Sequence, residues 1–376
     1  MQRQEPYRLV VFGDVLQRAA SSDGSRQVFG VFRESERLIQ VLGDDPSASS
    51  FFRSIGFVRR VGAENAFTVT LKAGRRTIRL ELEHDLPLPG ETQFYSGHEG
   101  LDERRKGLIA GGTLADKRVV VVGAGSLGST IALELAQAGV GSFTVLDFDQ
   151  LDTSNLSRHV CDLSDLGRSK AVALAERLRL RGVRAQGCDS DVTKENTKFL
   201  KRWFSKASLV LSTLDVPSAS FMVNELVVST GTPALFVGAY EGAAGAEIIP
   251  VRPGGPCLFC TVGFRADLTP DLSPKERRQA YQSADANRMV AEPGLGVDIN
   301  YIASVAAAHA LAMLDPEGSR ADLLASDGFT LIHGPSRPRD GLAELFTKPL
   351  ETIRARVTRD EPCPVCGYFT RAEKVS

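Results

Sequence analysis

Four of the six cysteines in the chain form two Cys-x-x-Cys pairs, Cys257 with Cys260 and Cys363 with Cys366. Each pair can place two sulfurs on one metal ion, and two such pairs make a tetrahedral four-sulfur site of the kind that holds structural zinc. That site has no open position for a substrate or a water, so we expect it to attach the C-terminal segment to the preceding domain. The alternative, two independent redox motifs, is disfavoured because neither pair opens a helix after a strand.

A glycine-rich turn, Gly123–Gly128, follows a continuous apolar run and precedes a helical pattern. A G-x-G-x-x-G turn in that position lets the backbone approach phosphates and points a helix N-terminus at them. Asp147 ends the next apolar run, where an acid usually holds ribose hydroxyls. These features alone predict NAD or FAD binding, and therefore an oxidoreductase. The turn residues assigned to the nucleotide site are Gly123, Gly125, Ser126, Leu127 and Gly128.

Three further features favour a triphosphate over a dinucleotide. After Asp147 comes a polar segment that ends in Arg158, which a dinucleotide does not need. Lys170 opens a later helix, and a lysine and an arginine that converge on a glycine-rich turn suit a triphosphate. Asp215 follows another apolar strand, at the sheet edge where it could hold Mg²⁺. Each charge alone could be a solvated surface group, but the ordered set predicts an ATP site. Its residues beyond the turn are Asp147, Asp149, Ser154, Asn155, Arg158 and Lys170.

The bulk composition is that of a soluble globular protein of 376 residues, with 43% apolar and 24% charged residues. A net charge of -1 gives no support for a nucleic-acid partner or an anionic membrane partner. No apolar run is long enough to span a bilayer, and the most apolar stretch, Ile302–Leu314, is typical of a buried helix. Because Met1–Glu5 contains no apolar signal core, we expect a cytoplasmic protein.

The elements that must position these residues alternate between strands and helices after Lys117. Arg118–Val122 ends at the glycine turn and has the unbroken apolar run of a buried parallel strand. Ser126–Ala138 has an apolar helical face, and Gly139 ends it. This alternation predicts an α/β fold with a doubly wound, mostly parallel, Rossmann-like sheet. Further elements are predicted at 143–146, 170–180, 209–212, 218–228 and 234–237.

Residues 1–90 form a separate compositional unit in which we find no residues for chemistry. We predict a small α+β domain with strands at Tyr7–Phe12 and Gln27–Phe32, a hairpin around Ala73-Gly74, and a helix near Ala48–Ile55. Substrate binding or dimerisation is its expected role. Residues 91–116 are predicted to be a linker with a helical lead-in, and residues 117–376 to be the ATP-binding domain with a zinc-binding C-terminal segment.

From about Leu101 to Cys366 the chain resembles the ThiF/MoeB/ubiquitin-activating-enzyme superfamily. The segments VVVVGAGSLGS, LDFDQLDTSNLSRH, GRSKA and LSTLD occur in the family's order and close to its spacing. The resemblance implies a ThiF-type domain in which the glycine turn and Asp147 hold ATP, while Arg158 and Lys170 contact its phosphates. It further implies that Asp215 engages Mg²⁺, that two cysteine pairs hold structural zinc, and that the protein is a homodimer with its ATP sites near the interface.

The activity that the resemblance implies is adenylyl transfer. A substrate's C-terminal carboxylate would attack the α-phosphorus of ATP and give an acyl-adenylate and pyrophosphate, with Arg158, Lys170 and Mg²⁺ supplying positive charge. The substrate would be a ubiquitin-like or sulfur-carrier protein, the commoner class. The alternative is a short precursor peptide, as for the peptide-modifying enzyme MccB, which also has a small N-terminal domain. An NAD- or FAD-dependent oxidoreductase and a non-catalytic binding protein are the alternatives of other classes.

The chain departs from the family at several places. Val216 stands where many members have an asparagine after the metal-binding aspartate. Arg104 and Arg105 are candidates for the arginine that members donate to a partner's ATP site, although the local match is weak. Thr261–Asn300 contains no cysteine, which argues against a thioester intermediate at the family's usual position. The other residues considered, which we place outside the catalytic set, are Cys161, Cys188 and His159.

Overall fold

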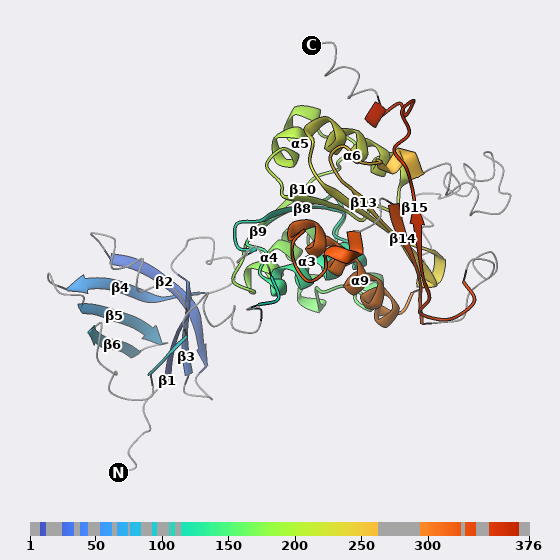
Figure 1. Ribbon diagram of the computed structural model, residues 1–376. Helices are drawn as coiled ribbons and strands as arrows, with labels where there is room; N and C mark the ends of the chain where they lie inside the picture. The colour runs from blue at the N-terminus through green and yellow to red at the C-terminus, as the bar shows by residue number, and fades with distance from the viewer. Residues whose placement is uncertain are drawn as a thin grey trace, which may run out of the picture. The chain divides into compact units, whose positions relative to one another are not determined.

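In the computed structural model the chain forms two compact units, Met1–Lys106 and Gly107–Ser376 (Figure 1). Each unit has its own β-sheet. The structure describes residues 8–12, 25–33, 38–43, 53–61, 66–73, 76–83, 92–95, 105, 107–109, 114–261, 294–324, 328–335 and 346–367.

A seven-stranded sheet makes up most of the described part of the first unit. Its strands are β1 Arg8–Phe12, β2 Ser25–Arg33, β3 Leu38–Gly43, β4 Arg53–Val61, β5 Ala66–Ala73, β6 Arg76–Glu83 and β7 Thr92–Tyr95. They lie in the order β6-β5-β4-β2-β3-β1-β7, antiparallel from β6 to β3 and parallel from β3 to β7. Val28, Phe29, Ile39, Val41 and Ile55 are among its buried hydrophobic residues.

The sequence predicts the strands of this unit better than its remaining segments. The first two predicted strands and the hairpin of β5 and β6 are confirmed. The predicted helix near Ala48–Ile55 is wrong at Arg53–Ile55, which begin β4, and residues 48–52 lie outside the described residues. The backbone of β4 pairs with β2 and β5, and its sequence is rich in the β-branched and aromatic residues that favour strands. Thr92–Tyr95, predicted to be linker, pairs instead with β1. No helix occurs among the described residues of this unit.

An eight-stranded sheet forms the centre of the second unit. Its strands are β8 Arg118–Val122, β9 Ser142–Asp147, β10 Arg184–Asp189, β11 Leu209–Ser212, β12 Ala234–Ala239, β13 Gly245–Val251, β14 Gly328–His333 and β15 Thr352–Arg356. They lie in the order β10-β9-β8-β11-β12-β13-β14-β15. The strands from β10 to β12 are parallel, whereas β13, β14 and β15 extend the sheet in antiparallel fashion. The predicted mostly parallel sheet is therefore present, with an antiparallel extension that the sequence did not predict.

Helices cover both faces of this sheet (Figure 1). One face is covered by α3 Ser126–Ala138, α4 Lys170–Arg179 and α9 Gly296–Leu314, and the other by α5 Thr197–Phe204 and α6 Pro217–Thr230. The residues of β8 divide between the two cores. Val119 and Val121 face the first core, and Val120 and Val122 face the second. A strand buried on both faces needs apolar residues at every position, which is why β8 is an unbroken valine run.

Helix α9 contains the apolar stretch predicted to be a buried helix. Among the described residues it is the one helix whose length and hydropathy would allow it to cross a membrane. However, 56% of its apolar window is buried inside the unit, where the helix packs on α3 and the sheet. Ile302, Ala306 and Ala310 are fully buried. This burial is what is expected of the core helix of an α/β domain.

Candidate functional site

The carboxyl ends of β8, β9 and β11 lie side by side. The line of these strand ends is called the carboxyl edge of the second sheet below. The chain order reverses at β8, because β9 lies on one side of it and β11 on the other. In open α/β sheets ligands bind outside the carboxyl ends of the strands at such a switch point. The glycine turn follows β8, Asp147 ends β9 and Asp215 follows β11. The fold therefore brings these three predicted features to one edge.

The glycine turn packs tightly against the loop after β11. Gly123 has a φ of 94°, in the left-handed region, and its carbonyl oxygen accepts a hydrogen bond from Thr213 Oγ1 at 2.8 Å. A Cβ on Gly128 would lie 2.0 Å from the same carbonyl oxygen, so α3 can approach the turn only with a glycine there. A Cβ on Gly125, in contrast, would meet nothing within 4 Å. The backbone is therefore open at Gly125, where α3 begins.

Asp147 holds the turn from the neighbouring strand. Its Oδ2 accepts a hydrogen bond from the Ala124 N–H at 2.6 Å, and its Oδ1 accepts one from the Asp149 N–H at 2.7 Å. Burial raises the pKa of this carboxyl, while the two N–H groups and the positive charge of Lys170 oppose the rise. A carboxylate can accept about four hydrogen bonds. Asp147 can thus fix the turn and still have acceptor capacity for the ribose hydroxyls it is predicted to hold.

Lys170, at the start of α4, forms an ion pair beside the turn. Its Nζ lies 2.9 Å from Asp149 Oδ2, with the lysine side chain 11% exposed and the aspartate side chain 50% exposed. The Lys170 N–H also donates to the Asp149 carbonyl oxygen at 2.9 Å. The positive charge of Lys170 lowers the pKa of both Asp147 and His159. Burial has the larger effect at each group, and it raises the pKa of Asp147 but lowers that of His159. The predicted cation is therefore held in place by Asp149.

The polar segment predicted to contact the nucleotide forms a short helical turn at Thr153–Asn155. Asn155 Oδ1 accepts a hydrogen bond from the Asp152 N–H at 3.0 Å, so the Asn155 side chain stabilises this helical turn itself. Ser154 is exposed. Arg158 follows the turn, and a Cβ on Gly294 would lie 3.2 Å from its Nη1. The guanidinium therefore lies next to the segment that leads into α9.

His159, which the sequence analysis set aside, contacts the glycine turn directly. Its Nε2 lies 2.7 Å from the Ala124 carbonyl oxygen, and its Nδ1 lies 3.0 Å from the backbone nitrogen of Cys161. Burial raises the pKa of the Cys161 thiol to about 12, so this cysteine is not a nucleophile at neutral pH. Burial also raises the pKa of Cys188, in β10. Burial therefore favours the neutral thiol at both cysteines.

Asp215 lies in the short segment between β11 and α6 and is exposed. The neighbouring Val216, which departs from the family pattern, is 51% exposed. An accessible carboxylate at the carboxyl edge of the sheet is the kind of ligand that Mg²⁺ prefers. Of the two candidate arginines for a partner's site, Arg104 lies outside the described residues and Arg105 is half-buried in the first unit.

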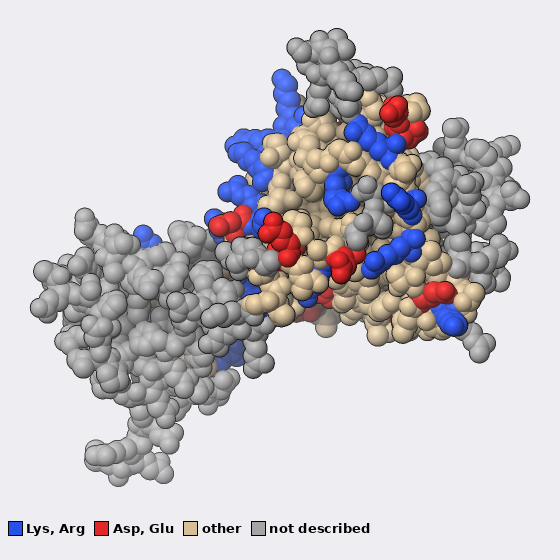
Figure 2. Space-filling model, viewed as in Figure 1, with Lys and Arg blue, Asp and Glu red and all other residues tan. Residues whose placement is uncertain are grey.

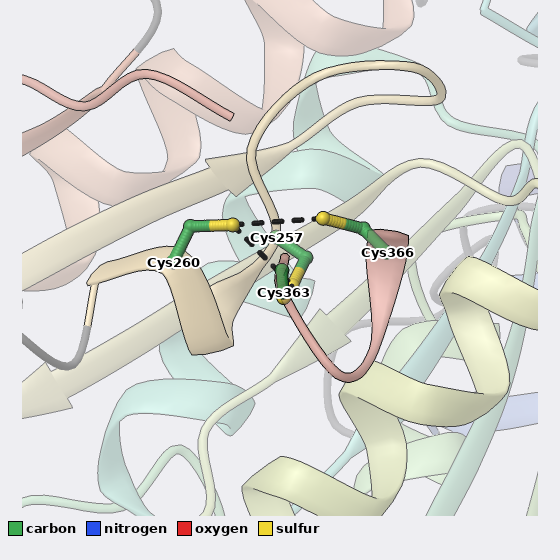
Figure 3. Close-up of side chains that lie close together, drawn as sticks. All are labelled: Cys257, Cys260, Cys363 and Cys366. Carbon is green, nitrogen blue, oxygen red and sulfur yellow. Dashed lines mark hydrogen bonds between the residues drawn. The ribbon is translucent and has the colours of Figure 1, made fainter. Parts of the chain in front are cut away.

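The four cysteines of the two pairs form one cluster (Figure 3). Their sulfurs all lie within 4.8 Å of one another. Cys257 Sγ is 3.9 Å from Cys260 Sγ and 3.8 Å from Cys363 Sγ, and Cys260 Sγ is 3.5 Å from Cys366 Sγ. Metal–sulfur bonds of about 2.3 Å place the sulfurs of a tetrahedron about 3.8 Å apart. Disulfide sulfurs would be about 2.05 Å apart. The geometry fits a metal ion, because all four sulfurs lie in one cluster and none is at disulfide-bond distance from another.

Three of the four cysteines are buried, Cys260 is half-buried, and the cluster is attached to α6. Cys257, Cys363 and Cys366 are at most 4% exposed. Burial raises the pKa of the Cys366 thiol, whereas backbone N–H groups lower that of Cys363 against the effect of burial. A metal ion would allow every sulfur to be a thiolate. Asn224 Oδ1, in α6, accepts a hydrogen bond from the Leu258 N–H at 3.0 Å and so holds the loop of the first pair.

A basic surface lies at the opposite, amino edge of the same sheet. Lys and Arg side chains gather on the side of the second unit that carries α5 (Figure 2). A shallow hollow there is lined by Arg118, Arg184, Lys206 and Trp203, among others. Because Arg118 and Arg184 begin their strands, the hollow is separated from the glycine turn by the length of the strands. It is therefore not part of the nucleotide site.

The fold and the site define a class of protein: an α/β nucleotide-binding domain whose C-terminal segment closes on a cysteine cluster. Comparison with known proteins then gives the family. Residues 110–337 match the ThiF family, and this is more than half of the chain. The chain belongs to the ThiF family.

Curated relatives share this domain. A sulfur carrier protein adenylyltransferase from Thermus thermophilus is 30% identical over 258 residues, which is 66% of this chain and 82% of the relative. The sulfur carrier protein ThiS adenylyltransferase of Bacillus subtilis is 32% identical over 189 residues, 47% of this chain and 55% of the relative. The chain thus spans only about half the length of the Bacillus relative.

Solved structures share the fold. The crystal structure of Escherichia coli MccB with ATP has a TM-score of 0.51 and 19% sequence identity, and the match covers 68% of each chain. The structure of MccB with the peptide MccA has a TM-score of 0.52 and 20% identity, covering 68% of this chain and 67% of that one. At this identity the likeness concerns the fold alone.

Sequence reasoning assigned no supporting role to three residues that the structure places at these sites. Thr213 lies inside the LSTLD segment but was not singled out, and His159 was set aside as structural. Asn224 carries no local signal, because it is one polar residue on a buried helix face. All three make their contacts with backbone groups far away in the sequence, and only the fold reveals such contacts.

Proposed function

We propose that this protein is an ATP-dependent adenylyltransferase that activates a C-terminal carboxylate. The observation that carries the proposal is the open backbone at Gly125. No side chain caps α3 there, and a Cβ would meet nothing. The first N–H groups of a helix bind anions, and the cations Lys170 and Arg158 come from neighbouring segments. The names of the Thermus and Bacillus relatives, both adenylyltransferases, support the same activity.

In the proposed reaction a carboxylate oxygen of the substrate attacks the α-phosphorus of ATP. The bond from that phosphorus to the oxygen bridging it to the β-phosphorus breaks, so that pyrophosphate leaves and an acyl-adenylate forms. The protein contributes alignment, and the cations Arg158 and Lys170 stabilise the negative charge that grows on the phosphate oxygens. Asp149 keeps the Lys170 ammonium beside the turn before the nucleotide arrives. Asp215 would hold Mg²⁺, which supplies further positive charge when bound.

The substrate that we favour is a ubiquitin-like or sulfur-carrier protein, because the relatives are named for sulfur carriers. A precursor peptide is the second candidate. The observation that favours it is the separate first unit, a sheet large enough to bind a peptide and lying outside the residues that match the ThiF family. We further propose that residues 1–90 serve substrate binding, with residues 117–376 as the adenylation domain, and that the enzyme is a cytoplasmic homodimer without nucleic-acid or membrane partners.

We infer that the cysteine cluster holds one structural zinc ion. The sulfur spacing, the burial of the cluster and the lack of an open ligand position support this role. Zinc in four-ligand sites of small peptides contributes about 10–16 kcal/mol of apparent binding energy. In this chain it would attach the segment after β15 to the loop after β13.

Pyrophosphate release tests the proposed function. The assay would add ATP and either a small protein ending in Gly-Gly or a short precursor peptide encoded beside this chain. The Asp215→Ala variant should stay folded and lose ATP–pyrophosphate exchange. Asp116→Ala is the matched control, because Asp116 is also exposed but lies at the amino end of β8. Full exchange by the Asp215 variant would refute the role of that carboxylate. If wild-type protein released no pyrophosphate with either substrate, the proposed activity would be refuted.

A further inference from the structure

The ring of His159 connects the glycine turn to the backbone at Cys161, and it can do so in one protonation state only. Its Nε2 lies 2.7 Å from the Ala124 carbonyl oxygen, and its Nδ1 lies 3.0 Å from the backbone nitrogen of Cys161. A carbonyl oxygen only accepts hydrogen bonds, so Nε2 must carry a proton. A backbone N–H only donates, so Nδ1 must be unprotonated. Both contacts are satisfied by the neutral imidazole with its proton on Nε2, and by no other state of the ring.

The contact with Ala124 determines how the glycine turn presents its backbone. The Ala124 carbonyl and the Gly125 N–H belong to one planar trans peptide, so they point in opposite directions. When His159 holds the carbonyl oxygen, the Gly125 N–H is directed away from the ring. The other groups of the turn are held from other sides, with the Ala124 N–H on Asp147 and the Gly123 carbonyl on Thr213. His159 therefore fixes the one peptide of the turn that these two residues leave free to rotate.

The position of His159 in the chain adds a second consequence. It directly follows Arg158, one of the two cations of the site. Holding the ring against the turn therefore also restrains the backbone of the neighbouring Arg158. We propose that His159 is a positioning residue that orients the Gly125 N–H toward the nucleotide phosphates and restrains the backbone that carries Arg158. This inference rests on the proposed function for its ligand, but its geometry is independent of that function.

The surroundings of the ring favour the neutral state that this role needs. Burial lowers the pKa of His159 below its usual value, the hydrogen bond to Ala124 and the charge of Asp165 raise it, and the charge of Lys170 lowers it. Because burial lowers the pKa of His159, its surroundings favour the neutral ring. Protonation at lower pH would place a second N–H against the Cys161 N–H and break that contact. Adenylation should therefore decline only at a pH below that at which a free imidazole becomes protonated.

Two amide substitutions separate the two hydrogen bonds. In His159→Gln the amide nitrogen lies about as far along the side chain as Nε2 of histidine, so it can still donate to the Ala124 carbonyl. In His159→Asn the amide oxygen lies about as far along the side chain as Nδ1 of histidine, so it can accept from the Cys161 N–H. The asparagine side chain is too short to reach the Ala124 carbonyl. We expect the Gln variant to keep the KM for ATP within about threefold of wild type. The Asn variant should raise it about tenfold, the loss expected for one hydrogen bond that is not replaced.

ATP–pyrophosphate exchange, direct titration with ATP and thermal unfolding would be measured together on the full chain. A purely structural role would lower the unfolding temperature of the Asn variant and leave its KM unchanged, and that result would overturn the inference. The Gln variant should also lose the decline in exchange at acidic pH that protonation of His159 causes in wild type. An Asn variant with wild-type KM, ATP affinity and pH profile would equally contradict the proposal.

The protonation state can be read without any activity. Nitrogen-15 NMR of the histidine rings at pH 7 should show His159, assigned by its loss in the Gln variant, with a protonated Nε2 and an unprotonated Nδ1. A ring protonated on Nδ1, or on both nitrogens, would overturn the inference even if adenylation were established. Conversely, a protein that shows the expected tautomer but never releases pyrophosphate would refute the proposed function and leave the inferred geometry of the turn unchanged.

Discussion

Replacing Gly125 with alanine should separate nucleotide binding from folding. Gly125 has φ of -72° and ψ of -164°, values that alanine adopts without strain. Its Cβ would meet no protein atom within 4 Å. The variant should therefore fold as well as wild type, with up to about 1 kcal/mol of added stability from the less flexible unfolded chain. The new methyl group would occupy the open space through which a phosphate approaches the backbone.

The expected loss of affinity follows from the hydrogen bonds that the methyl group displaces. One hydrogen bond to a charged group contributes about 1.5–3 kcal/mol. Because 1.4 kcal/mol corresponds to about tenfold in Kd, losing one such bond should weaken ATP binding about 10- to 100-fold. Gly128→Ala is the contrasting change. Its Cβ would lie 2.0 Å from the Gly123 carbonyl oxygen and 2.6 Å from Thr213 Oγ1, so the turn itself must move and both stability and binding should fall.

Isothermal titration with ATP and Mg²⁺, together with thermal unfolding, distinguishes these outcomes. The Gly125 variant should keep the unfolding temperature of wild type and lose ATP affinity, while the Gly128 variant should lose both. NAD serves as the comparison ligand, and we expect no binding of NAD by the wild type. Wild-type affinity for ATP in the Gly125 variant would refute the assignment of the turn as the phosphate site.

Two further predictions concern the supports of the sites. Thr213→Val removes the hydroxyl that donates to the Gly123 carbonyl at 2.8 Å, and urea titration should show a loss of about 1–3 kcal/mol of unfolding free energy. Thr213→Ser keeps the hydroxyl and should keep most of that stability. Equal stability of the two variants would show that the hydroxyl does not hold the turn. Metal analysis should find about one zinc per chain, and Cys363→Ser or a chelator should release it and lower the unfolding temperature of the second unit; a metal-free protein of undiminished stability would rule out a structural role.

The second unit is the part of the fold that sequence predicts best. The strand Arg118–Val122, the helix Ser126–Ala138 and the strand Leu209–Ser212 have their predicted bounds. Their signals are local: an unbroken apolar run, an amphipathic period, and a glycine in the left-handed conformation at Gly139, where φ is 106°. The antiparallel strands β13 to β15 were missed because they add to the sheet through pairings between distant segments.

The first unit shows where local signals fail. Residues 48–55 were predicted to be helical, yet Arg53–Ile55 begin β4 because cross-strand pairing with β2 outweighs local preference. Thr92–Tyr95 looked like linker because four residues carry too short a pattern, and the parallel pairing with β1 makes them a strand.

The candidate site divides in the same way. The glycine turn, Asp147 and the cysteine pairs were predicted because their chemistry depends on residue type and spacing. Thr213 was not singled out, and His159 was considered but set aside. Each contacts a backbone carbonyl of the turn, and the sequence does not show which carbonyl a side chain will reach. The ion pair of Lys170 with Asp149 was also not predicted, although both residues were assigned to the site.

A crystal structure of the protein with bound ATP would test the central claim most directly. We predict the triphosphate at the carboxyl edge of the second sheet, with phosphate oxygens within hydrogen-bonding distance of the Gly125 N–H, the Arg158 guanidinium and the Lys170 ammonium. ATP bound elsewhere, or bound at the turn with both cations directed into solvent, would contradict the account.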